Sequence, residues 1–348
     1  MTDAVREPVT RTHATMADVA KAAGVSLKSV SRVINKEPHV TDALRAKVEA
    51  AIRELAYVPD TAARSLAGAR SFTIGVLFDN PSPNYTMKVL AGAYSACIEH
   101  QYHLRIDTID TSADTATLDA VLEAIFRHSR SDGFVLTPPV SDDPRVLAAL
   151  DRHGARYSRL APIVEHGEAM SVRIDDEAAG ARVADMFLDL GHRRFGLVNG
   201  PDSHGAAHQR RTGFLNRLAQ RDPSLVVEEA FGGFQFERGI EAGRQLLARE
   251  QRPTAIFATN DDSAAGVIIA CNQMGLAVPR DISVCGFDDS WVARTVWPYL
   301  TTIHQPIEAM AKAAARMIIA RGDSNPELRT RQLDFELILR DSVGPVPA

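Results

Sequence analysis

The sequence predicts an α/β protein in which an N-terminal all-α helix-turn-helix headpiece precedes two doubly wound α/β subdomains. The chain has 348 residues, enough for about two domains and a small third. Residues 15–57 hold short helical patterns and no strand-like run. From Phe72 onward, continuous apolar runs alternate with helical stretches, which is the pattern of buried parallel strands joined by crossover helices.

Composition argues against several classes of protein. With 45% hydrophobic and 24% charged residues, the chain has the balance of a soluble globular protein. No apolar run approaches the ~20 residues of a membrane helix, and residues 1–14 lack the hydrophobic segment of a secretory signal. We therefore expect a cytoplasmic protein without a membrane partner. Cys97, Cys271 and Cys285 form no CxxC pair, so we expect small core residues rather than a disulfide framework or a zinc site.

The net charge of −5 is unevenly distributed along the chain. Residues 1–70 contain 11 Lys and Arg against 8 Asp and Glu, while the remainder contains 28 against 36. A basic head on an acidic body indicates that the head meets a polyanion. A solvated surface explains so small an excess equally well, so this observation alone leaves both interpretations open.

The strands and helices after Phe72 form two series, which predicts two subdomains. Strands of the first series are expected at 72–78, 103–109, 133–137 and 155–160. Strands of the second series are expected at 171–174, 195–198, 225–229, 255–258 and 282–286. In open parallel sheets, ligands bind outside the carboxyl ends of the strands. We therefore expect a ligand cleft between the two subdomains.

Residues 16–34, MADVAKAAGVSLKSVSRVI, predict two helices joined by a tight turn. Gly24 ends the first helix where a positive φ is needed, and Ser26 offers an N-cap for the second. The second helix keeps four side chains off its buried face: Leu27, Lys28, Ser31 and Arg32. That is the arrangement of a recognition helix that points side chains at base edges. The alternative is an ordinary helical hairpin with solvated charges.

Longer motifs resemble one known family. DVAKAAGVSLKSVSRVIN, VTDALRAKVEAAIRELAYVPD and ARSLAG resemble the headpiece and hinge of the lactose/galactose repressor (LacI/GalR) family. GHRRFGLVNG, PTAIFATNDDSAAG, VPRDISVCGFDD, PYLTTIHQP and LDFELILRDS resemble the core of that family in order and spacing. The resemblance covers roughly residues 15–342 and implies a bacterial transcription factor with a periplasmic-binding-protein-like effector domain. Residues 1–14 fall outside it and are expected to be a disordered tail.

The resemblance also implies the domain boundaries. We expect a headpiece at 15–59, a hinge at 60–70 and an effector domain at 71–342. Within the effector domain we expect an N-subdomain of about 71–171 and 306–328, and a C-subdomain of about 172–305 and 329–342, with three crossings between them. The hinge helix, residues 60–67, is too short to be stable alone in water. It is expected to fold only against a partner hinge and DNA.

DNA-contacting residues follow from the resemblance, position by position. It implies base contacts from Leu27, Lys28 and Arg32, and positions near phosphates for Thr15, Ser26, Ser29, Ser31, Asn35 and His39. Arg and Lys donate to guanine O6 and N7, whereas hydroxyl groups and helix N-termini hold phosphates without reading sequence. Leu66 resembles the leucine that family members wedge into the minor groove. The alternative is that Leu66 simply closes a linker.

The resemblance places a second set of residues in the ligand cleft. These residues are Asn80, Asn84, Tyr85, Arg210, Phe234, Asn260, Asp288 and Gln305. Carboxylate, guanidinium and amide groups pair with vicinal hydroxyls, and an aromatic face covers the C–H side of a sugar ring. Arg159 is expected to support the pocket from behind. Core packing for the aromatic residues, and an ion pair between Arg210 and Asp288, remain the alternatives.

The sequence offers little catalytic equipment, since it contains no GxGxxG, P-loop, GxSxG or HExxH motif. His204 and His208 have the spacing of a metal pair but no third ligand, so we expect surface or cleft-rim histidines and no cofactor. We predict a non-enzymatic regulator: a homodimer that binds a pseudo-palindromic operator, represses carbohydrate genes and responds to a sugar-like effector. The alternative is a sugar-binding or sugar-processing protein of the same α/β fold.

Overall fold

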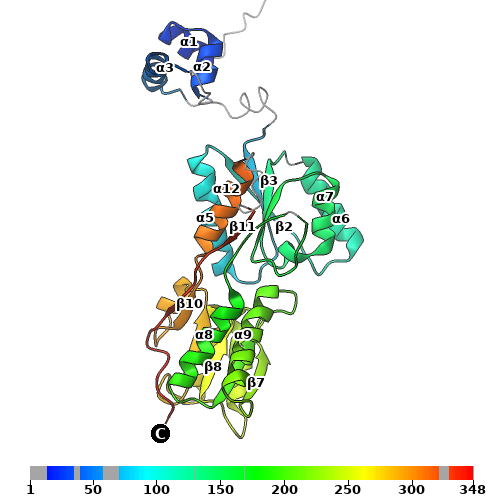
Figure 1. Ribbon diagram of the computed structural model, residues 1–348, viewed down its shortest axis with the longest axis vertical. Helices are drawn as coiled ribbons and strands as arrows, with labels where there is room; N and C mark the ends of the chain where they lie inside the picture. The colour runs from blue at the N-terminus through cyan, green and yellow to red at the C-terminus, as the bar shows by residue number, and fades with distance from the viewer. Residues whose placement is uncertain are drawn as a thin grey trace, which may run out of the picture. The chain divides into compact units, whose positions relative to one another are not determined.

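The computed structural model describes residues 14–34, 40–57, 70–128, 130–167, 169–320 and 329–347. The chain divides into two compact units, Met1–Ser71 and Phe72–Ala348 (Figure 1). The predicted disordered tail, apart from its last residue, and the predicted hinge helix lie outside the described residues.

Within its described residues, the first unit contains three helices: α1 (Met16–Ala23), α2 (Leu27–Ile34) and α3 (Asp42–Glu54). Thr15 caps α1 in a capping box with Asp18, whose carboxylate accepts from the Thr15 N–H at 2.8 Å. Gly24 ends α1 at φ +63°, in the left-handed region. Ser26 Oγ then accepts from the backbone N–H of Ser29 at 3.1 Å, as an N-cap for α2.

The helices of this unit share one small apolar core. Val19 from α1, Val30 from α2 and Val48 from α3 are completely buried, with Val33 and Ala51 beside them. Complete burial of a valine side chain stabilises the folded state by about 1.5–3 kcal/mol. The pairing of a capped turn with this core fixes the angle between α1 and α2 and leaves the opposite face of α2 to solvent.

The second unit contains two sheets of six strands each within the described residues. The first sheet has the order β11-β5-β4-β3-β1-β2 and is parallel throughout. Its strands are Thr73–Phe78 (β1), His103–Thr108 (β2), Gly133–Leu136 (β3), Tyr157–Leu160 (β4), Met170–Arg173 (β5) and Thr330–Gln332 (β11).

The second sheet has the order β12-β10-β9-β8-β6-β7, and its edge strand β12 runs antiparallel to β10. Its strands are Arg194–Asn199 (β6), Val226–Phe231 (β7), Ala255–Ala258 (β8), Ser283–Phe287 (β9), Thr301–His304 (β10) and Glu336–Ile338 (β12). These two doubly wound sheets, with the three-helix unit, confirm the predicted fold class.

Helices cover both faces of each sheet. Around the first sheet lie α5 (Pro83–Glu99) and α12 (Ile307–Ile319) on one face, and α6 (Thr115–His128) and α7 (Pro144–Arg152) on the other (Figure 1). The second sheet is covered by α8 (Asp176–Asp189), α9 (Gly205–Arg221), α10 (Phe236–Leu247) and α11 (Asp261–Gln273). Among the described residues of this unit, two 3₁₀ turns, η1 (Val140–Asp142) and η2 (Trp291–Arg294), lie in the connecting loops.

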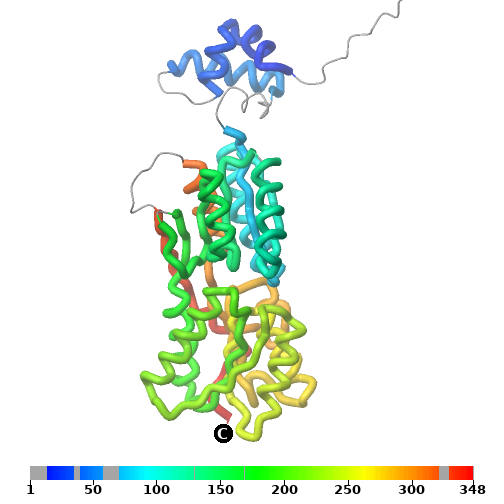
Figure 2. Tube along the Cα trace, turned by 90° about the vertical axis from the view of Figure 1, so that its right-hand side faces the viewer, coloured from blue at the N-terminus to red at the C-terminus, as the bar shows by residue number. Residues whose placement is uncertain are grey.

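Strand pairing shifts two of the expected subdomain boundaries. Strand β5 pairs with β4 and β11, so it belongs to the first sheet and does not begin the second series as expected. Thr330–Gln332 also lies in the first sheet, whereas 329–342 was expected in the C-subdomain. The chain passes from one subdomain to the other after β5, after β10 and between β11 and β12 (Figure 2). An apolar run has the same periodicity in either sheet, which is why the sequence pattern alone misplaced β5.

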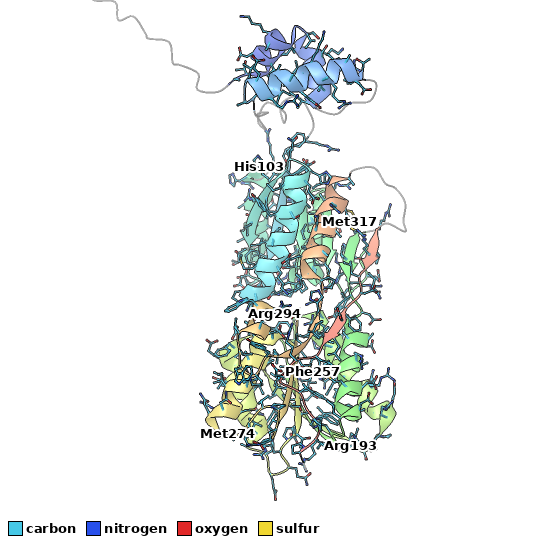
Figure 3. All side chains as sticks on the ribbon, turned by 90° about the vertical axis from the view of Figure 1, so that its left-hand side faces the viewer. His103, Arg193, Phe257, Met274, Arg294 and Met317 are labelled. Carbon is cyan, nitrogen blue, oxygen red and sulfur yellow. The ribbon has the colours of Figure 1, made fainter. Side chains whose placement is uncertain are left out.

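The cores lie between the sheets and their helices. Phe187, Phe195, Phe214 and Phe257 form an aromatic cluster against the second sheet, with Phe214 and Phe257 ring centroids 5.3 Å apart. Figure 3 shows Phe257 in the interior of this subdomain. The three cysteines are free and buried, as expected of small core residues.

Within the described ranges, no helix combines the length and the apolarity required to span a membrane.

Candidate functional site

The solvent-facing side of α2 carries the predicted base-contacting residues. Leu27 is 53% exposed, and Lys28 is exposed beside it, while Arg32 is half-buried one turn further on. Thr15 and Ser26 lie at the starts of α1 and α2, where both hydroxyls already bind backbone N–H groups. Asn35, His39 and Leu66 lie outside the described residues.

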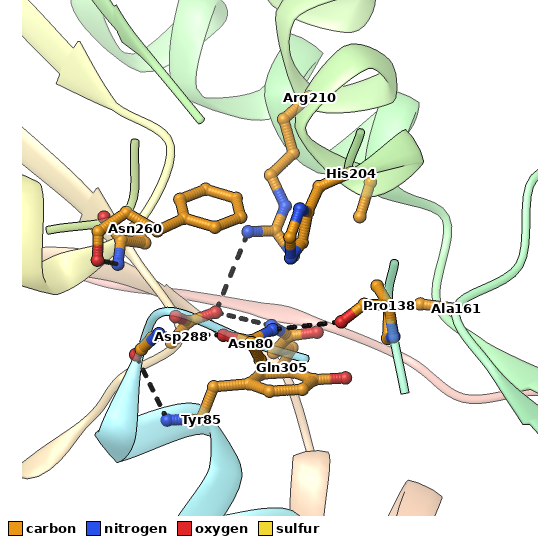
Figure 4. A pocket seen from close by; sticks show the side chains of 12 residues that line it. Asn80, Tyr85, Pro138, Ala161, His204, Arg210, Asn260, Asp288 and Gln305 are labelled. Atoms are coloured by element: carbon orange, nitrogen blue, oxygen red, sulfur yellow. Dashed lines mark hydrogen bonds and ion pairs between the residues drawn. The ribbon is translucent and has the colours of Figure 1, made fainter. Parts of the chain in front are cut away.

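The second candidate site is a pocket between the two sheets of the larger unit, with an empty volume of about 370 Å³. Seven of the eight predicted cleft residues line it: Asn80, Tyr85, Arg210, Phe234, Asn260, Asp288 and Gln305. Five further residues complete the lining: Ser82, Pro138, Ala161, His204 and Ala206. Side chains from α9 face Tyr85, which projects from the start of α5 on the opposite wall (Figure 4).

Arg210 is held rigidly by groups behind the pocket. Its Nε donates to Asp176 Oδ1 at 2.8 Å, and its Nη1 donates to the Thr259 carbonyl at 2.8 Å. The guanidinium carbon lies 3.5 Å from the centroid of the Phe287 ring. Burial raises the pKa of Asp176, and the Arg210 charge opposes this. The side chain is therefore fixed by several partners at once.

The backbone beneath Arg210 is equally constrained. A Cβ atom at Gly180 of α8 would overlap the Arg210 carbonyl, and one at Gly213 of α9 would overlap the Glu177 carbonyl. Helices α8 and α9 thus pack backbone against backbone, which only glycine allows at these two positions. This close approach sets the distance between Arg210 and Asp176.

Asp288 brings a carboxylate into the same pocket. It follows β9 with φ +109°, and its N–H donates to the Ile303 carbonyl at 2.8 Å. Its Oδ1 accepts from Gln305 Nε2 at 2.5 Å and lies 3.8 Å from Arg210 Nη1. Burial raises its pKa to about 6, although Arg210 and Gln305 stabilise the charged form. The ion pair expected as an alternative is thus present as a long contact within the pocket lining.

The aspartates next to or near the pocket residues bind partners outside the pocket. The Asp289 carboxylate binds Arg340 at 2.5 Å and His304 at 3.1 Å, and Arg340 holds its pKa below the usual value despite burial. Asp261 accepts from Thr302 Oγ1 and the Ser290 N–H, each at 2.6 Å. Neither Asp261 nor Asp289 lines the pocket.

Asn84 is the predicted cleft residue that the structure does not bring into the pocket. Its Nδ2 donates to Asp262 Oδ1 at 2.5 Å, and its Oδ1 accepts from the Trp291 indole N–H. Ser82 Oγ also donates to Asp262, at 2.6 Å. Because α5 already begins at Pro83, neighbouring residues Asn84 and Tyr85 point about 100° apart on the helix. Tyr85 faces the pocket, while Asn84 bridges the two subdomains beside it.

Asn260 and Phe234 are coupled to each other. Asn260 Oδ1 accepts from the Ser263 N–H at 3.0 Å as the N-cap of α11, and its Nδ2 donates to the Phe234 carbonyl at 3.1 Å. Phe234 has φ +61°, and its ring meets the His204 ring edge-on at a centroid distance of 5.3 Å. Asn260 therefore orients an aromatic wall of the pocket through the backbone.

His204 is the lining residue that sequence reasoning misplaced, because a surface or rim position was expected. It is 3% exposed, and burial lowers its pKa to about 4. Its Nδ1 lies 3.3 Å from Ser203 Oγ, whereas its buried Nε2 has no hydrogen-bond partner among the described residues. His208 is exposed, as expected, and binds the Asp202 carbonyl. The available signal was that His204 follows β6, at the same sheet edge as the other pocket residues.

Arg159 lies behind the pocket wall, where the sequence interpretation put it. Its Nε donates to the Ser141 carbonyl at 2.6 Å, and its Nη2 binds Asp142 Oδ1 at 2.5 Å and the Val164 carbonyl at 2.8 Å. These bonds fix the loop that presents Ala161 to the pocket. Across the described parts of the chain, no group of three His, Cys, Asp or Glu side chains has the arrangement of a metal site.

Comparison with known proteins gives consistent matches in both units. Residues 15–60 match the model for "Bacterial regulatory proteins, lacI family", and residues 184–343 match the "Periplasmic binding protein-like domain". The ribose operon repressor of Escherichia coli (strain K12) is 34% identical over 333 residues, covering 94% of this chain and 98% of that protein. The HTH-type transcriptional repressor PurR of Pectobacterium carotovorum subsp. carotovorum (strain PC1) is 36% identical, covering 96% and 98%.

Solved structures agree over nearly the whole chain. A lac repressor dimer bound to operator and the anti-inducer ONPF superposes with a TM-score of 0.75 at 26% identity, covering 96% of this chain and all of that one. A complex of the transcriptional regulator CelR with cellobiose gives a TM-score of 0.68 at 28% identity, covering 95% and 100%.

Proposed function

Because the chain belongs to the lacI family of bacterial regulatory proteins, we propose that it is a homodimeric repressor that binds a pseudo-palindromic operator under the control of a small sugar-like effector. The observation that carries the proposal is the presence on one chain of two sites: a helix-turn-helix with a cationic outer face, and a pocket lined by polar and aromatic side chains. A regulator needs both, and a carbohydrate-binding protein alone needs only the second.

For the headpiece, we propose that Lys28 and Arg32 donate to base edges in the major groove and that Leu27 makes apolar contact there. Hydroxyl groups at the starts of α1 and α2, and on the face of α2, would hold phosphates: Thr15, Ser26, Ser29 and Ser31. Asn35, His39 and Leu66 keep their proposed roles as phosphate contacts and minor-groove wedge. Leu27 differs from the polar or aromatic residue of some relatives, so the operator is expected to have its own sequence.

For the effector, we propose direct contacts from Tyr85, Arg210, Asp288 and Gln305, with Phe234 covering a ring face. For Asn84 we propose a role in closing the cleft, through its bond to Asp262, in place of the ligand contact that the resemblance implied.

An exposed apolar stripe supports the homodimer. On α5, Met87, Tyr94 and Ile98 are 64%, 55% and 58% exposed, and their spacings of seven and four residues place them on one side of the helix. Contiguous apolar surface of this kind marks a protein interface. A second copy of the chain is the proposed partner, since a two-fold operator requires two headpieces.

The direct test is selection from a random double-stranded DNA library with the full chain. We expect a two-fold symmetric consensus, with two half-sites whose spacing reflects the dimer. Recovery of no enriched sequence would contradict the regulator and favour the sugar-binding or sugar-processing alternative. Mass spectrometry of each binding sugar after incubation with the protein separates these two, because we propose that the sugar is recovered unchanged.

A further inference from the structure

The pocket contains one permanent cation, and its charge is already compensated. Among the described lining residues, Arg210 is the single Arg or Lys. Its guanidinium lies between the carboxylates of Asp176, at 2.8 Å, and Asp288, at 3.8 Å. A phosphate or carboxylate ligand would have to compete with both for the same guanidinium. It would also lie beside two buried carboxylates of its own sign.

Cations close to the pocket are engaged elsewhere. Lys88 Nζ donates to the backbone carbonyls of Asp288 and Asp289, at 2.9 and 2.8 Å. Arg159 binds Asp142 behind the wall. The His204 ring adds no charge near neutral pH, because burial lowers its pKa to about 4. The pocket thus lacks the clustered cations that recognise anionic groups.

The hydrogen-bonding groups of the pocket are a mixture of donors and acceptors. Arg210 offers donors only, Asp288 offers acceptors, and Gln305 keeps its amide oxygen as an acceptor while its Nε2 binds Asp288. Tyr85 adds a hydroxyl from the opposite wall (Figure 4). Sugar hydroxyls both donate and accept, so neighbouring hydroxyls on one ring satisfy such a mixture. An ionised phosphate or carboxylate group only accepts hydrogen bonds, so it cannot satisfy the acceptors of Asp288 and Gln305.

His204 brings into the pocket lining a buried polar atom without a hydrogen-bond partner in the described part of the chain. Its Nε2 is buried without a partner among the described residues, and the ring, from the N-cap of α9, lies beside the Arg210 side chain on the wall opposite Tyr85 (Figure 4). A buried polar atom without a hydrogen bond costs free energy in the folded protein. A ligand hydroxyl in the pocket would remove that cost.

We propose that the pocket selects an uncharged, hydroxylated ligand over its phosphorylated or acidic counterparts, and that His204 forms a hydrogen bond with this ligand through Nε2. This deepens the proposed function, since it rests on the pocket being the effector site. It assigns the class of ligand and one specificity-determining residue that was expected at the surface or the cleft rim from the sequence.

The first experiment is calorimetry of the full chain without DNA, with ligands in matched sets. D-ribose and D-glucose are each compared with the 5- or 6-phosphate, and D-glucose also with gluconate and glucosamine; D-galactose and D-fructose extend the neutral set. We expect at least one neutral sugar to bind, at least tenfold more tightly than its charged counterparts. Tighter binding of a charged member, or no binding by any neutral sugar, would overturn the proposal.

The second experiment separates a ligand contact from a structural role at His204. His204→Leu should lower the affinity for the neutral sugar at least tenfold, whereas His204→Gln, which keeps an amide donor and acceptor, should stay within about threefold of wild type. The free His204→Leu protein should melt no lower than wild type, because the substitution removes an unpaired buried polar atom. A lower melting temperature with unchanged sugar affinity would make His204 structural and contradict the proposal.

His208→Leu is the matched control, because this histidine lies four residues further along α9 with an exposed ring. It should leave sugar affinity unchanged. Calorimetry measures ligand binding to the pocket in the absence of DNA. The ligand inference and the proposed repressor function can therefore fail separately. A neutral sugar that binds through His204 but never alters operator binding would contradict the repressor and leave this inference standing. A sugar phosphate that controls operator binding would do the reverse.

Discussion

Asn84 and Asp262 hydrogen-bond to each other across the cleft, Nδ2 to Oδ1 at 2.5 Å, although 178 residues separate them in the chain. Asn84 begins α5 over the first sheet, and Asp262 begins α11 over the second. The Trp291 indole N–H also binds Asn84, and Ser82 shares the Asp262 carboxylate. These contacts hold the two subdomains together beside the pocket without occupying it.

Asn84→Ala should therefore favour an open cleft. A hydrogen bond to a charged group contributes about 1.5–3 kcal/mol, which corresponds to a roughly 10- to 150-fold shift in the equilibrium between closed and open forms. We expect a larger radius of gyration in small-angle X-ray scattering and faster effector dissociation. Asn272→Ala, at an exposed position on α11, is the control and should change neither. Identical scattering and kinetics in both variants would show that these contacts do not govern closure.

Arg32→Ala should cost about 1–3 kcal/mol of specific operator binding and relax the preference at one position of each half-site. The reason is that a base contact carries sequence information, whereas a phosphate contact does not. Fluorescence anisotropy with specific and scrambled duplexes measures both. Arg53→Ala removes the same charge from α3 and should affect the two duplexes alike. Equal losses on both duplexes for Arg32→Ala would remove it from base reading.

Asp288→Ala should abolish the effector response while operator affinity stays near that of wild type, because Asp288 belongs to the larger unit and not to the headpiece. Calorimetry with the effector and anisotropy with the operator give the two values. Asp202→Ala, an exposed carboxylate on the loop before α9, serves as the control. Unchanged sugar affinity in Asp288→Ala would take this carboxylate out of the site.

The pH dependence of stability should reveal the buried carboxylate of Asp288. Its pKa is raised to about 6 in the folded protein, above the ~3.9 of an unfolded chain, so the folded state binds the proton first as the pH falls. Asp288 therefore stabilises the fold by about 1.4 kcal/mol per pH unit on acidification from about pH 6 to about pH 4. Asp288→Asn should lose this contribution, so that the variant becomes less stable relative to wild type as the pH falls in chemical denaturation.

His204 should show the opposite sign. Its folded pKa of about 4 lies below the unfolded value of ~6.5, so the unfolded state binds the proton first. The fold loses stability on acidification between these values, and His204→Gln should abolish that loss. Denaturation curves for the two variants between pH 4 and pH 7 should therefore deviate from wild type in opposite directions. Deviation in the same direction would contradict one of the two assignments.

Most of the pocket was predictable because its residues follow strands, and the carboxyl ends of parallel strands meet at one edge. Two kinds of detail were not. The side-chain direction of Asn84 depends on where α5 begins, which Ser82 as N-cap and Pro83 determine, and a shift of one residue on a helix turns a side chain by about 100°. The burial of His204 depends on Phe234, 30 residues later, which packs against it. Likewise, the sheet that β5 joins depends on its partner β11, near the end of the chain.

The glycine contacts between α8 and α9 have a consequence for how ligand preference can change. Gly180 and Gly213 tie the Arg210 anchor to the main chain of two helices, so no single side-chain replacement can relocate it gradually. His204 and Ala206 carry no such backbone restriction, since they line the pocket from the N-cap and the first turn of α9. We therefore expect effector recognition to diversify, by evolution or in the laboratory, more readily at these two positions than at Arg210.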